Sequence, residues 1–214
     1  MSVRQATHDS LDQFACSLVH SLPFCPSTAY SVPLPAPNGR TTYDAASLPS
    51  TVSQPILSSL QNFARSLLTF ACGRDVFSPL QTCEGCMEAY RSWVCAVSLP
   101  RCGEAPASAL RPRDQTVFQL DSPPAMLMHP PNDPPRISSL APLDRAYAEI
   151  LPCLETCQAV DRACPATLQW ACPLATVNAN ASYGVGFVDS EDGRKGQGKT
   201  GRAFDESGRT WCNM

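Results

Sequence analysis

The sequence predicts a mainly α, disulfide-rich domain with short strands and long proline-rich loops. Its 214 residues include 12 cysteines, an even number spread over almost the whole length, and 21 prolines. Apolar residues also recur at three- and four-residue steps in three stretches, which is the period of an amphipathic helix. Charged residues make up only 16% of the chain, well below the usual quarter. This low share, together with the high proline content, indicates a loop-rich chain.

The cysteine content predicts folding in the secretory pathway, because cytosolic glutathione keeps thiols reduced and six disulfides need an oxidising compartment. The N-terminal stretch MSVRQATHDS has no apolar core of a signal peptide. The apolar run at 63–71 is interrupted by Arg65 and is too short to span a membrane. We therefore expect a fragment or truncated gene model of a longer protein, which faces the extracellular side of the plasma membrane or the ER lumen.

Net charge argues against one class of partner. The formal net charge is −3 and the sequence pI is about 5.6, without basic runs. A chain of this charge has no electrostatic attraction to phosphate backbones, so nucleic acid is not an expected partner.

Three helices are expected from the apolar periodicity. Ser53 or Gln54 is the predicted cap of the first helix, with Pro55 in its first turn. Its apolar positions are Ile56, Leu60, Phe63, Leu67 and Phe70. The second helix is expected from about Pro79, and one face would carry Cys83, Cys86, Met87, Tyr90 and Val94. The third is expected from about Asp144, with a kink at Pro152, and its apolar positions are Tyr147, Ile150, Leu151, Leu154, Cys157 and Val160.

The predicted organisation is an N-terminal tail at 1–15 and one domain at 16–212. Two segments interrupt that domain: a proline-rich connection at 103–143 and a flexible glycine-rich, charged segment at 186–210. A connection as long as 103–143 is either an ordered docking loop or a disordered linker, and both readings stay open. If it docks a partner, the candidate contacts are Phe118, Met126, Leu127 and Met128.

Zinc binding and redox chemistry are the alternatives for the cysteines. The CEGC motif at 83–86 and the CLETC motif at 153–157 have the spacing of zinc-ligand pairs. A zinc site would leave eight cysteines unexplained, and we expect all twelve to oxidise in the secretory pathway. A redox CxxC motif needs a helix N-terminus to lower its thiol pKa, whereas a helix-like pattern is already under way at Cys83.

No catalytic residues or cofactors are expected. The three histidines are His8, His20 and His129, none in a readable catalytic context. Four glutamates have the spacing of solvated helix faces: Glu84, Glu88, Glu149 and Glu155. One N-x-S sequon, Asn180-Ala181-Ser182, is a candidate glycosylation site in a secreted chain.

The cysteine spacing resembles that of the Frizzled-type cysteine-rich domain. Pro152, Cys153, Cys157 and Cys164 match its PCxxxC(x6)C signature. The stretches YRSWVCAVSLPRC at 90–102 and FCPSTAYSVPLPAPN at 24–38 are similar to two further elements of that family. The resemblance implies five bridges, Cys16–Cys102, Cys25–Cys95, Cys86–Cys164, Cys153–Cys212 and Cys157–Cys172. Cys72 and Cys83 have no counterpart there, and they are left to pair with each other. The resemblance leaves open which of Cys83 and Cys86 takes the family position.

A narrower resemblance is to the fungal stretch-activated calcium-channel subunit family, the pheromone-induced-death proteins. It rests on FCPSTAYSVP, CEGCMEAYRSWVCAVSLPRC, ILPCLETCQAVDRACP and NASYG. The family implies a non-catalytic, extracytoplasmic glycoprotein that binds the pore-forming alpha subunit of a voltage-gated-type calcium channel and supports calcium entry. Membrane association would come through that partner. The alternative, from the Frizzled resemblance, is a secreted module that binds a lipid or sterol.

Overall fold

The computed structural model describes residues 16–70, 81–103, 126–174, 177–184 and 212–214. Its strands are β1 (Ser17–Val19), β2 (Tyr30–Val32), β3 (Thr42–Tyr43), β4 (Arg101–Gly103), β5 (Met126–His129) and β6 (Tyr147–Ile150). Its α-helices are α2 (Ser50–Leu67), α3 (Cys83–Ser98) and α4 (Leu154–Ala163), and two short 3-10 helices, η1 (Ala166–Leu168) and η2 (Ala179–Ala181), follow.

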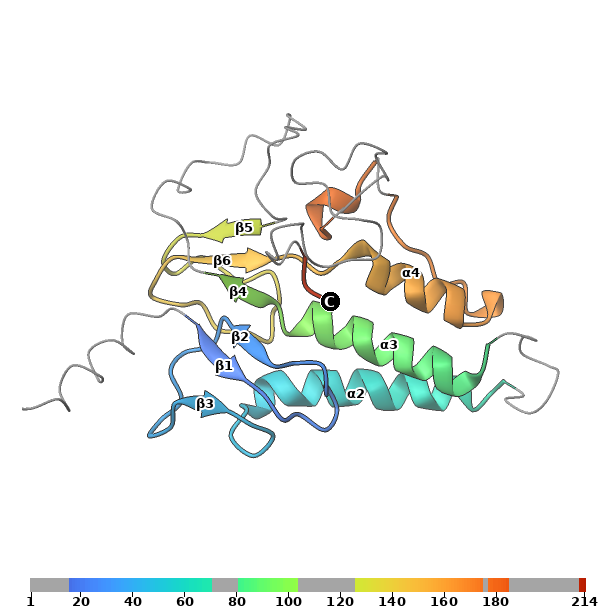
Figure 1. Cartoon of the computed structure of the whole chain (residues 1–214), viewed down its shortest axis with the longest axis horizontal. Coiled ribbons are helices and arrows are strands. Elements are labelled where there is room, and N and C mark those ends of the chain that lie inside the picture. The colour runs from blue at the N-terminus through green and yellow to red at the C-terminus, as the bar shows by residue number, and fades with distance from the viewer. Residues whose placement is uncertain (1–15, 71–80, 104–125, 175–176, 185–211) are drawn as a thin grey trace, which may run out of the picture.

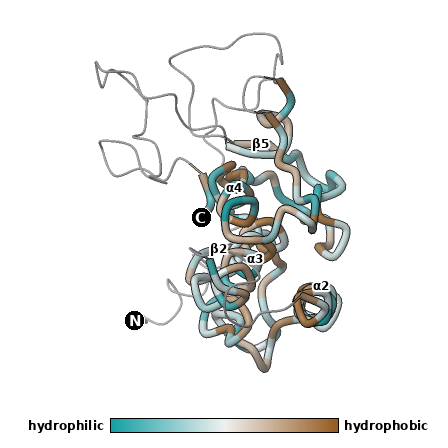
Figure 2. Tube along the Cα trace, turned by 90° about the vertical axis from the view of Figure 1, so that its right-hand side faces the viewer, coloured by the Kyte–Doolittle hydropathy of each residue, from teal (hydrophilic) through white to brown (hydrophobic). Residues whose placement is uncertain are grey.

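The helices lie in a row with α3 in the middle. Helix α3 contacts both α2 and α4, and the strands lie to one side of the row, near one end of each helix (Figure 1). Figure 2 looks along the helices and shows α3 between α4 and α2. Helix α3 therefore connects the other two helices and is partly covered on both sides.

The strands form two three-stranded sheets. In the first, β1 is central, antiparallel to β2 and parallel to β3. In the second, β6 is central and antiparallel to both β4 and β5. The prediction of a mainly α domain is therefore only partly right. The helices are the longest elements, but the described residues also contain two sheets.

The largest apolar core lies between α2, α3 and the first sheet. Helix α2 buries Val52, Ile56 and Leu60 at four-residue steps, so these side chains lie on one face. They join a buried cluster made of Val19, Leu22, Cys25, Val32, Leu34, Tyr43, Leu48, Val94, Cys95, Leu99 and Leu140. Removing an aliphatic side chain of this kind from water contributes about 1.5–3 kcal/mol, so this face fixes α2 against the strands.

Helix α2 begins earlier than predicted. It starts at Ser50, after Pro49, and Pro55 lies inside the helix, not in its first turn. The Pro49 carbonyl accepts hydrogen bonds from the backbone N–H groups of Val52 and Ser53. Val52 is only 2% exposed, and the earlier start brings its side chain onto the buried face.

Helix α3 begins later than predicted, at Cys83 and not near Pro79. Thr82 is its N-cap, and the Thr82 hydroxyl oxygen accepts a hydrogen bond from the Gly85 backbone N–H at 3.0 Å. This side chain satisfies one of the N–H groups that a helix start leaves without an intrahelical acceptor. The cap explains why the helix starts where it does.

The third predicted helix is wrong in its first half. Residues 147–150 form β6, the central strand of the second sheet, and all four are buried. Pro152 disfavours the helical conformation of the residue before it, so the helix starts only at Leu154, after the proline. A second correction concerns the connection at 103–143, because its residues 126–129 form strand β5.

Five disulfides connect the described elements. Their Cα–Cα distances run from 4.7 to 6.3 Å, and the pairs are Cys16–Cys102, Cys25–Cys95, Cys86–Cys164, Cys153–Cys212 and Cys157–Cys172. These are the pairs that the Frizzled resemblance implies. Cys83 is also disulfide-bonded, but Cys72 lies outside the described residues, so the Cys72–Cys83 bridge stays a prediction.

Candidate functional site

The second sheet carries a buried cluster of charged side chains. In the β5–β6 ladder, Leu127 is opposite Glu149 and His129 is opposite Tyr147. Directly opposite residues of an antiparallel pair point to the same face of the sheet. His129, Tyr147 and Glu149 therefore share one face, and all three are buried.

His129 lies between two carboxylates. Its Nε2 atom is 3.0 Å from Glu149 Oε2, and its Nδ1 atom is 2.8 Å from Asp133 Oδ2. The imidazole ring stacks on Tyr147, with ring centroids 4.6 Å apart and planes 12° from parallel. Two acceptors and one aromatic face thus fix the orientation of this ring.

Arg136 completes the charge balance of the cluster. Its Nε donates to Glu149 Oε1 at 2.9 Å, its Nη2 lies 2.9 Å from the same oxygen, and its Nη1 donates to the Ser182 carbonyl at 3.1 Å. The Glu149 side chain is only 2% exposed. A buried carboxylate is tolerated only when it is paired and hydrogen-bonded, and Arg136 and His129 together meet that need.

The cluster shifts two ionisation equilibria. The hydrogen bond to Glu149 is the main reason that the pKa of His129 is raised; burial opposes it, and Asp133 adds to it. Burial, followed by the charges of Glu149 and Asp133, raises the pKa of Tyr147 to about 12. The imidazolium is favoured and the phenol stays neutral.

This arrangement does not resemble a catalytic site. Both ring nitrogens of His129 face carboxylates, so in this arrangement the imidazole cannot act as a base toward a hydroxyl or thiol nucleophile. The expectation that Glu149 is a solvated helix residue is wrong, because Glu149 is 1% exposed and lies on a central strand. Glu84 and Glu88 are exposed on α3, as a solvated face requires.

The candidate docking residues have a different setting from the one expected. Met126, Leu127 and Met128 belong to β5, which is an edge strand of its sheet, and each is partly exposed. This stretch is therefore a strand and not part of a disordered linker. Phe118 lies outside the described residues.

In the oxidised state that the structure describes, the disulfides argue against zinc binding and against redox chemistry at the two cysteine motifs. Cys86, Cys153 and Cys157 are each bonded to a cysteine outside their own motif, and Cys83 is disulfide-bonded too. Cys83 is the first residue of α3, so the argument that a helix is already under way there is wrong. The redox reading fails for another reason, which is that Cys86 pairs with Cys164 and not with Cys83.

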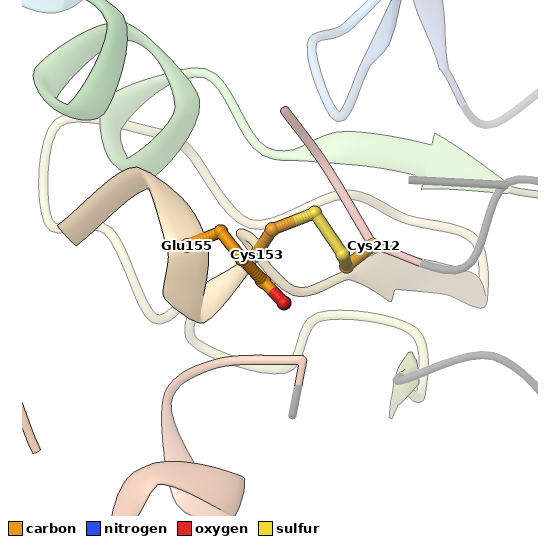
Figure 3. Close-up of side chains that lie close together, drawn as sticks. All are labelled: Cys153, Glu155 and Cys212. Carbon is orange, nitrogen blue, oxygen red and sulfur yellow. A yellow bond between two sulfur atoms is a disulfide. The ribbon is translucent and has the colours of Figure 1, made fainter. Parts of the chain in front are cut away.

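A further group of potential ligands lies at the start of α4. Figure 3 shows Glu155 beside the Cys153–Cys212 disulfide. One ligand atom from each of the three residues lies within 4.8 Å of the others. Both sulfurs are bonded to each other, so the group offers no thiolate to a metal in this state.

Aromatic side chains from α2, from α3 and from the segment after η1 pack against one another. Phe63 of α2 stacks on Tyr90 of α3 with centroids 3.7 Å apart, and Trp170 lies edge-on to Tyr90 and Trp93. The indole N–H of Trp93 donates to the Tyr183 hydroxyl at 2.9 Å. This hydrogen bond ties α3 to the segment that contains the sequon, whose Asn180 lies in η2.

Comparison with known proteins decides the family. A family model described as "Stretch-activated Ca2+-permeable channel component" matches residues 3–198, most of the chain. The chain belongs to the Mid1 family. The family resemblance found in the sequence is thereby confirmed.

Three curated relatives of the Mid1 family align with the chain. They are similar to it over part of their own length.

The chain is 36% identical to "Stretch-activated cation channel MID1" of Cryptococcus neoformans var. grubii, over 94% of the chain and 34% of that protein. It is 35% identical to "Stretch-activated cation channel MID1" of Saccharomyces cerevisiae, over 74% of the chain and 26% of that protein. It is 28% identical to "Stretch-activated cation channel yam8" of Schizosaccharomyces pombe, over 94% of the chain and 38% of that protein. The chain thus spans roughly a quarter to two fifths of each Mid1-family relative. No solved structure matches it.

The Mid1-family match includes the charged cluster and the aromatic group, since both lie within residues 3–198. Of the five described disulfides, only the one to Cys212 has a partner beyond the matched residues. Among the helices that the structure describes, none is long and apolar enough to cross a bilayer.

Proposed function

We propose that this chain is the cysteine-rich part of a non-catalytic regulatory subunit, which binds the pore-forming alpha subunit of a voltage-gated-type calcium channel and supports calcium entry. The observation that supports it is the Mid1-family match over residues 3–198, because that family is described as a channel component. The relatives are named as cation channels and not as enzymes. Our proposal assigns the conducting pore to the partner, through which the chain associates with the membrane.

The disulfides support an extracytoplasmic location. Five bridges in a domain of this size favour folding in the secretory pathway, and the proposed site of action is the extracellular face of the plasma membrane or the ER lumen. In that compartment the Asn180-Ala181-Ser182 sequon would carry an N-linked glycan. The backbone of Asn180 lies in the short helix η2, close to exposed Ser182.

The proposed contact surface for the channel is β5. An edge strand has backbone N–H and C=O groups directed away from its ladder partner, and among the described strands β5 pairs with β6 alone. Met126, Leu127 and Met128 add partly exposed apolar side chains, and methionine adapts to irregular surfaces. Strand β5 itself is held in place at its last residue, because His129 is bound to Asp133 and Glu149.

Regulation by such a domain would act through binding equilibria. A partner changes the populations of channel conformations only if it binds one conformation more tightly than another. A framework cross-linked by disulfides suits this role, because a rigid surface loses little conformational entropy on binding.

Affinity capture tests this proposal. The oxidised, tagged chain is incubated with detergent-solubilised fungal membranes, and bound proteins are identified by mass spectrometry. We expect recovery of the pore-forming calcium-channel subunit. The double variant Met126→Glu/Met128→Glu should lose that recovery, because two charges would be buried in the contact.

Leu174→Glu is the matched control, since Leu174 is 65% exposed and is not part of β5. It should leave recovery unchanged, and thermal melts should show that all variants are folded. Recovery of no channel by the folded wild-type chain would overturn the proposal. Recovery that survives the β5 double variant would overturn only the assignment of the surface. A bound acyl chain or sterol in native mass spectra, with no channel captured, would favour the lipid-binding alternative.

A further inference from the structure

We propose that Asp133, His129 and Glu149 form a proton-dependent clasp, which holds the turn after β5 against the second sheet while the imidazole is protonated and releases the turn at Asp133 when it is not. The observation behind it is that one ring is hydrogen-bonded to two carboxylates at once, at 2.8 and 3.0 Å.

The first step of the argument concerns donors. A carboxylate only accepts hydrogen bonds, and a neutral imidazole has one N–H and one bare nitrogen. Only the imidazolium has two N–H donors. Both bonds of His129 can therefore exist together only when the ring is charged, and loss of one proton leaves a lone pair facing a carboxylate oxygen.

The second step identifies the carboxylate that is released. The Glu149 side chain is 2% exposed and also pairs with Arg136, so it keeps a partner after the proton leaves. The Asp133 side chain is 37% exposed, and water can solvate it as soon as it moves away. The single remaining N–H is therefore best placed toward Glu149, and the contact to Asp133 opens.

The third step concerns the segment that Asp133 holds. The Asp133 backbone N–H donates to the Pro130 carbonyl at 3.2 Å, and the neighbouring Asn132 N–H donates to the Leu143 carbonyl. Asn132 has a φ of 61°, a left-handed conformation that asparagine tolerates. Release of Asp133 removes the side-chain anchor of this turn and leaves it with backbone hydrogen bonds that water can replace.

The charges around the ring make the clasp respond to one proton. Within the part of the chain that the structure describes, the charged groups that contact the ring or its partners are Asp133, Arg136 and Glu149, and the stacked Tyr147 phenol stays neutral. On β4, the residue opposite Glu149 is Cys102, whose sulfur is in a disulfide and does not titrate. The cluster is electrically balanced with the imidazolium present and carries one net negative charge without it.

The direction of the pH dependence follows from the same contacts. Because the hydrogen bond to Glu149 raises the pKa of His129 above its usual value, the folded state holds the proton more tightly than the unfolded chain. The stabilisation is fully present below the ordinary histidine pKa of about 6.5. It is lost as the pH rises through the raised value.

Imidazole NMR combined with amide exchange tests the clasp. The oxidised full chain, labelled with nitrogen-15, is titrated from about pH 5 to about pH 9, the range in which histidines change charge. Exchange rates are corrected for the intrinsic effect of pH. We expect His129 to titrate above the ordinary histidine value, and the protection of the Asn132 and Asp133 amides to fall about tenfold or more in the same transition.

His20 is the internal control. Its Nδ1 and Nε2 atoms face the hydroxyls of Ser21 and Thr42 at 2.9 and 3.1 Å. A hydroxyl can donate or accept, so both bonds can survive loss of the ring proton. The His20 amide, which donates to the Tyr43 carbonyl, should keep its protection over the range.

The variant Asp133→Asn removes the partly exposed carboxylate and should leave the fold intact. It should lower the titration midpoint of His129 and abolish the pH dependence of protection in the turn. A wild-type His129 midpoint at or below the ordinary value would overturn the clasp. Unchanged protection of the Asn132 and Asp133 amides while His129 loses its proton would overturn it as well.

Discussion

The side-chain amide of Asn213 donates a hydrogen bond to the carbonyl of Leu99, 114 positions earlier in the chain, at 3.2 Å. The same nitrogen lies 3.1 Å from the carbonyl of Ala96. Both carbonyls belong to the end of α3, where a helix leaves C=O groups without intrahelical donors. The penultimate residue of the chain thus caps a central helix.

Replacement of this cap should destabilise the domain. We expect Asn213→Ala to lower the free energy of unfolding by about 1–3 kcal/mol, because the buried Ala96 carbonyl would lose its Asn213 donor, while the Leu99 carbonyl would keep the Tyr30 hydroxyl. Urea unfolding with the disulfides intact measures this change. Met214→Ala is the matched control, since Met214 is 51% exposed, and it should change stability little. Equal stability of the wild type and Asn213→Ala would show that the cap contributes nothing.

The acidic centre of the charged cluster should be intolerant of neutralisation. Glu149→Gln leaves Arg136 and His129 beside an uncharged amide in a buried site. Removing one partner of a buried ion pair typically costs about 3–5 kcal/mol, so we expect a loss of that order. Thermal and urea unfolding measure it.

Glu84→Gln is a control for the same chemical change at an exposed position in the first turn of α3. It should cost less than about 1 kcal/mol, since exposed charges and helix-dipole effects are small. A Glu149→Gln variant as stable as Glu84→Gln would mean that the cluster does not need its buried charge.

The sequence predicted a helix well where apolar residues repeat at helical spacing over several turns. In α2, Val52, Ile56 and Leu60 repeat at four-residue steps, and the predicted helix exists with an earlier start. The start was missed because it depends on which residues are buried against the strands. Helix propensity and capping patterns alone do not contain that information.

Strand β6 was missed because a short apolar run fits two periods. Tyr147, Ile150 and Leu151 have helical spacing, but the four residues 147–150 are all buried in a central strand. Such runs cannot be assigned by periodicity alone. The partners that decide the matter, β4 and β5, lie far away in the sequence.

The charged cluster was missed for the same reason. His129 and Asp133 are four residues apart, but the contact to Glu149 depends on the register of β5 against β6. A shift of one residue would turn His129 to the other face of the sheet. The disulfide framework was easier, because cysteine spacing is a long-range pattern that the family resemblance preserves.

The hydrogen bond from Trp93 to Tyr183 should couple α3 to the sequon segment. We expect Tyr183→Phe to lower the free energy of unfolding by about 0.5–1.5 kcal/mol, the usual net value of one hydrogen bond. Trp93→Phe should cost more, because Trp93 also packs edge-on against Trp170. In a double-mutant cycle the two changes should be non-additive, whereas purely additive costs would show that the bond contributes no coupling.

The bridges Cys16–Cys102 and Cys25–Cys95 should protect each other. Their sequence separations are 86 and 70 residues, and the loop closed by Cys25–Cys95 lies inside the loop closed by Cys16–Cys102. The two bridges together therefore also close a small ring, which contains only the residues between the two pairs of cysteines. With one bridge present, the other constrains only about 16 further residues, for which the loop-entropy model gives about 3 kcal/mol.

Loss of the second bridge then frees the whole long loop, for which the same model gives about 4.5 kcal/mol. We therefore expect the double variant Cys16→Ala/Cys102→Ala to lower the free energy of unfolding by less than the further change Cys25→Ala/Cys95→Ala in the same protein. Urea unfolding of the single-bridge and double-bridge variants, with intact masses confirming the remaining disulfides, measures both steps. A second step no larger than the first would mean that the unfolded chain does not gain the freedom of the long loop, and that residual structure or another bridge restrains it.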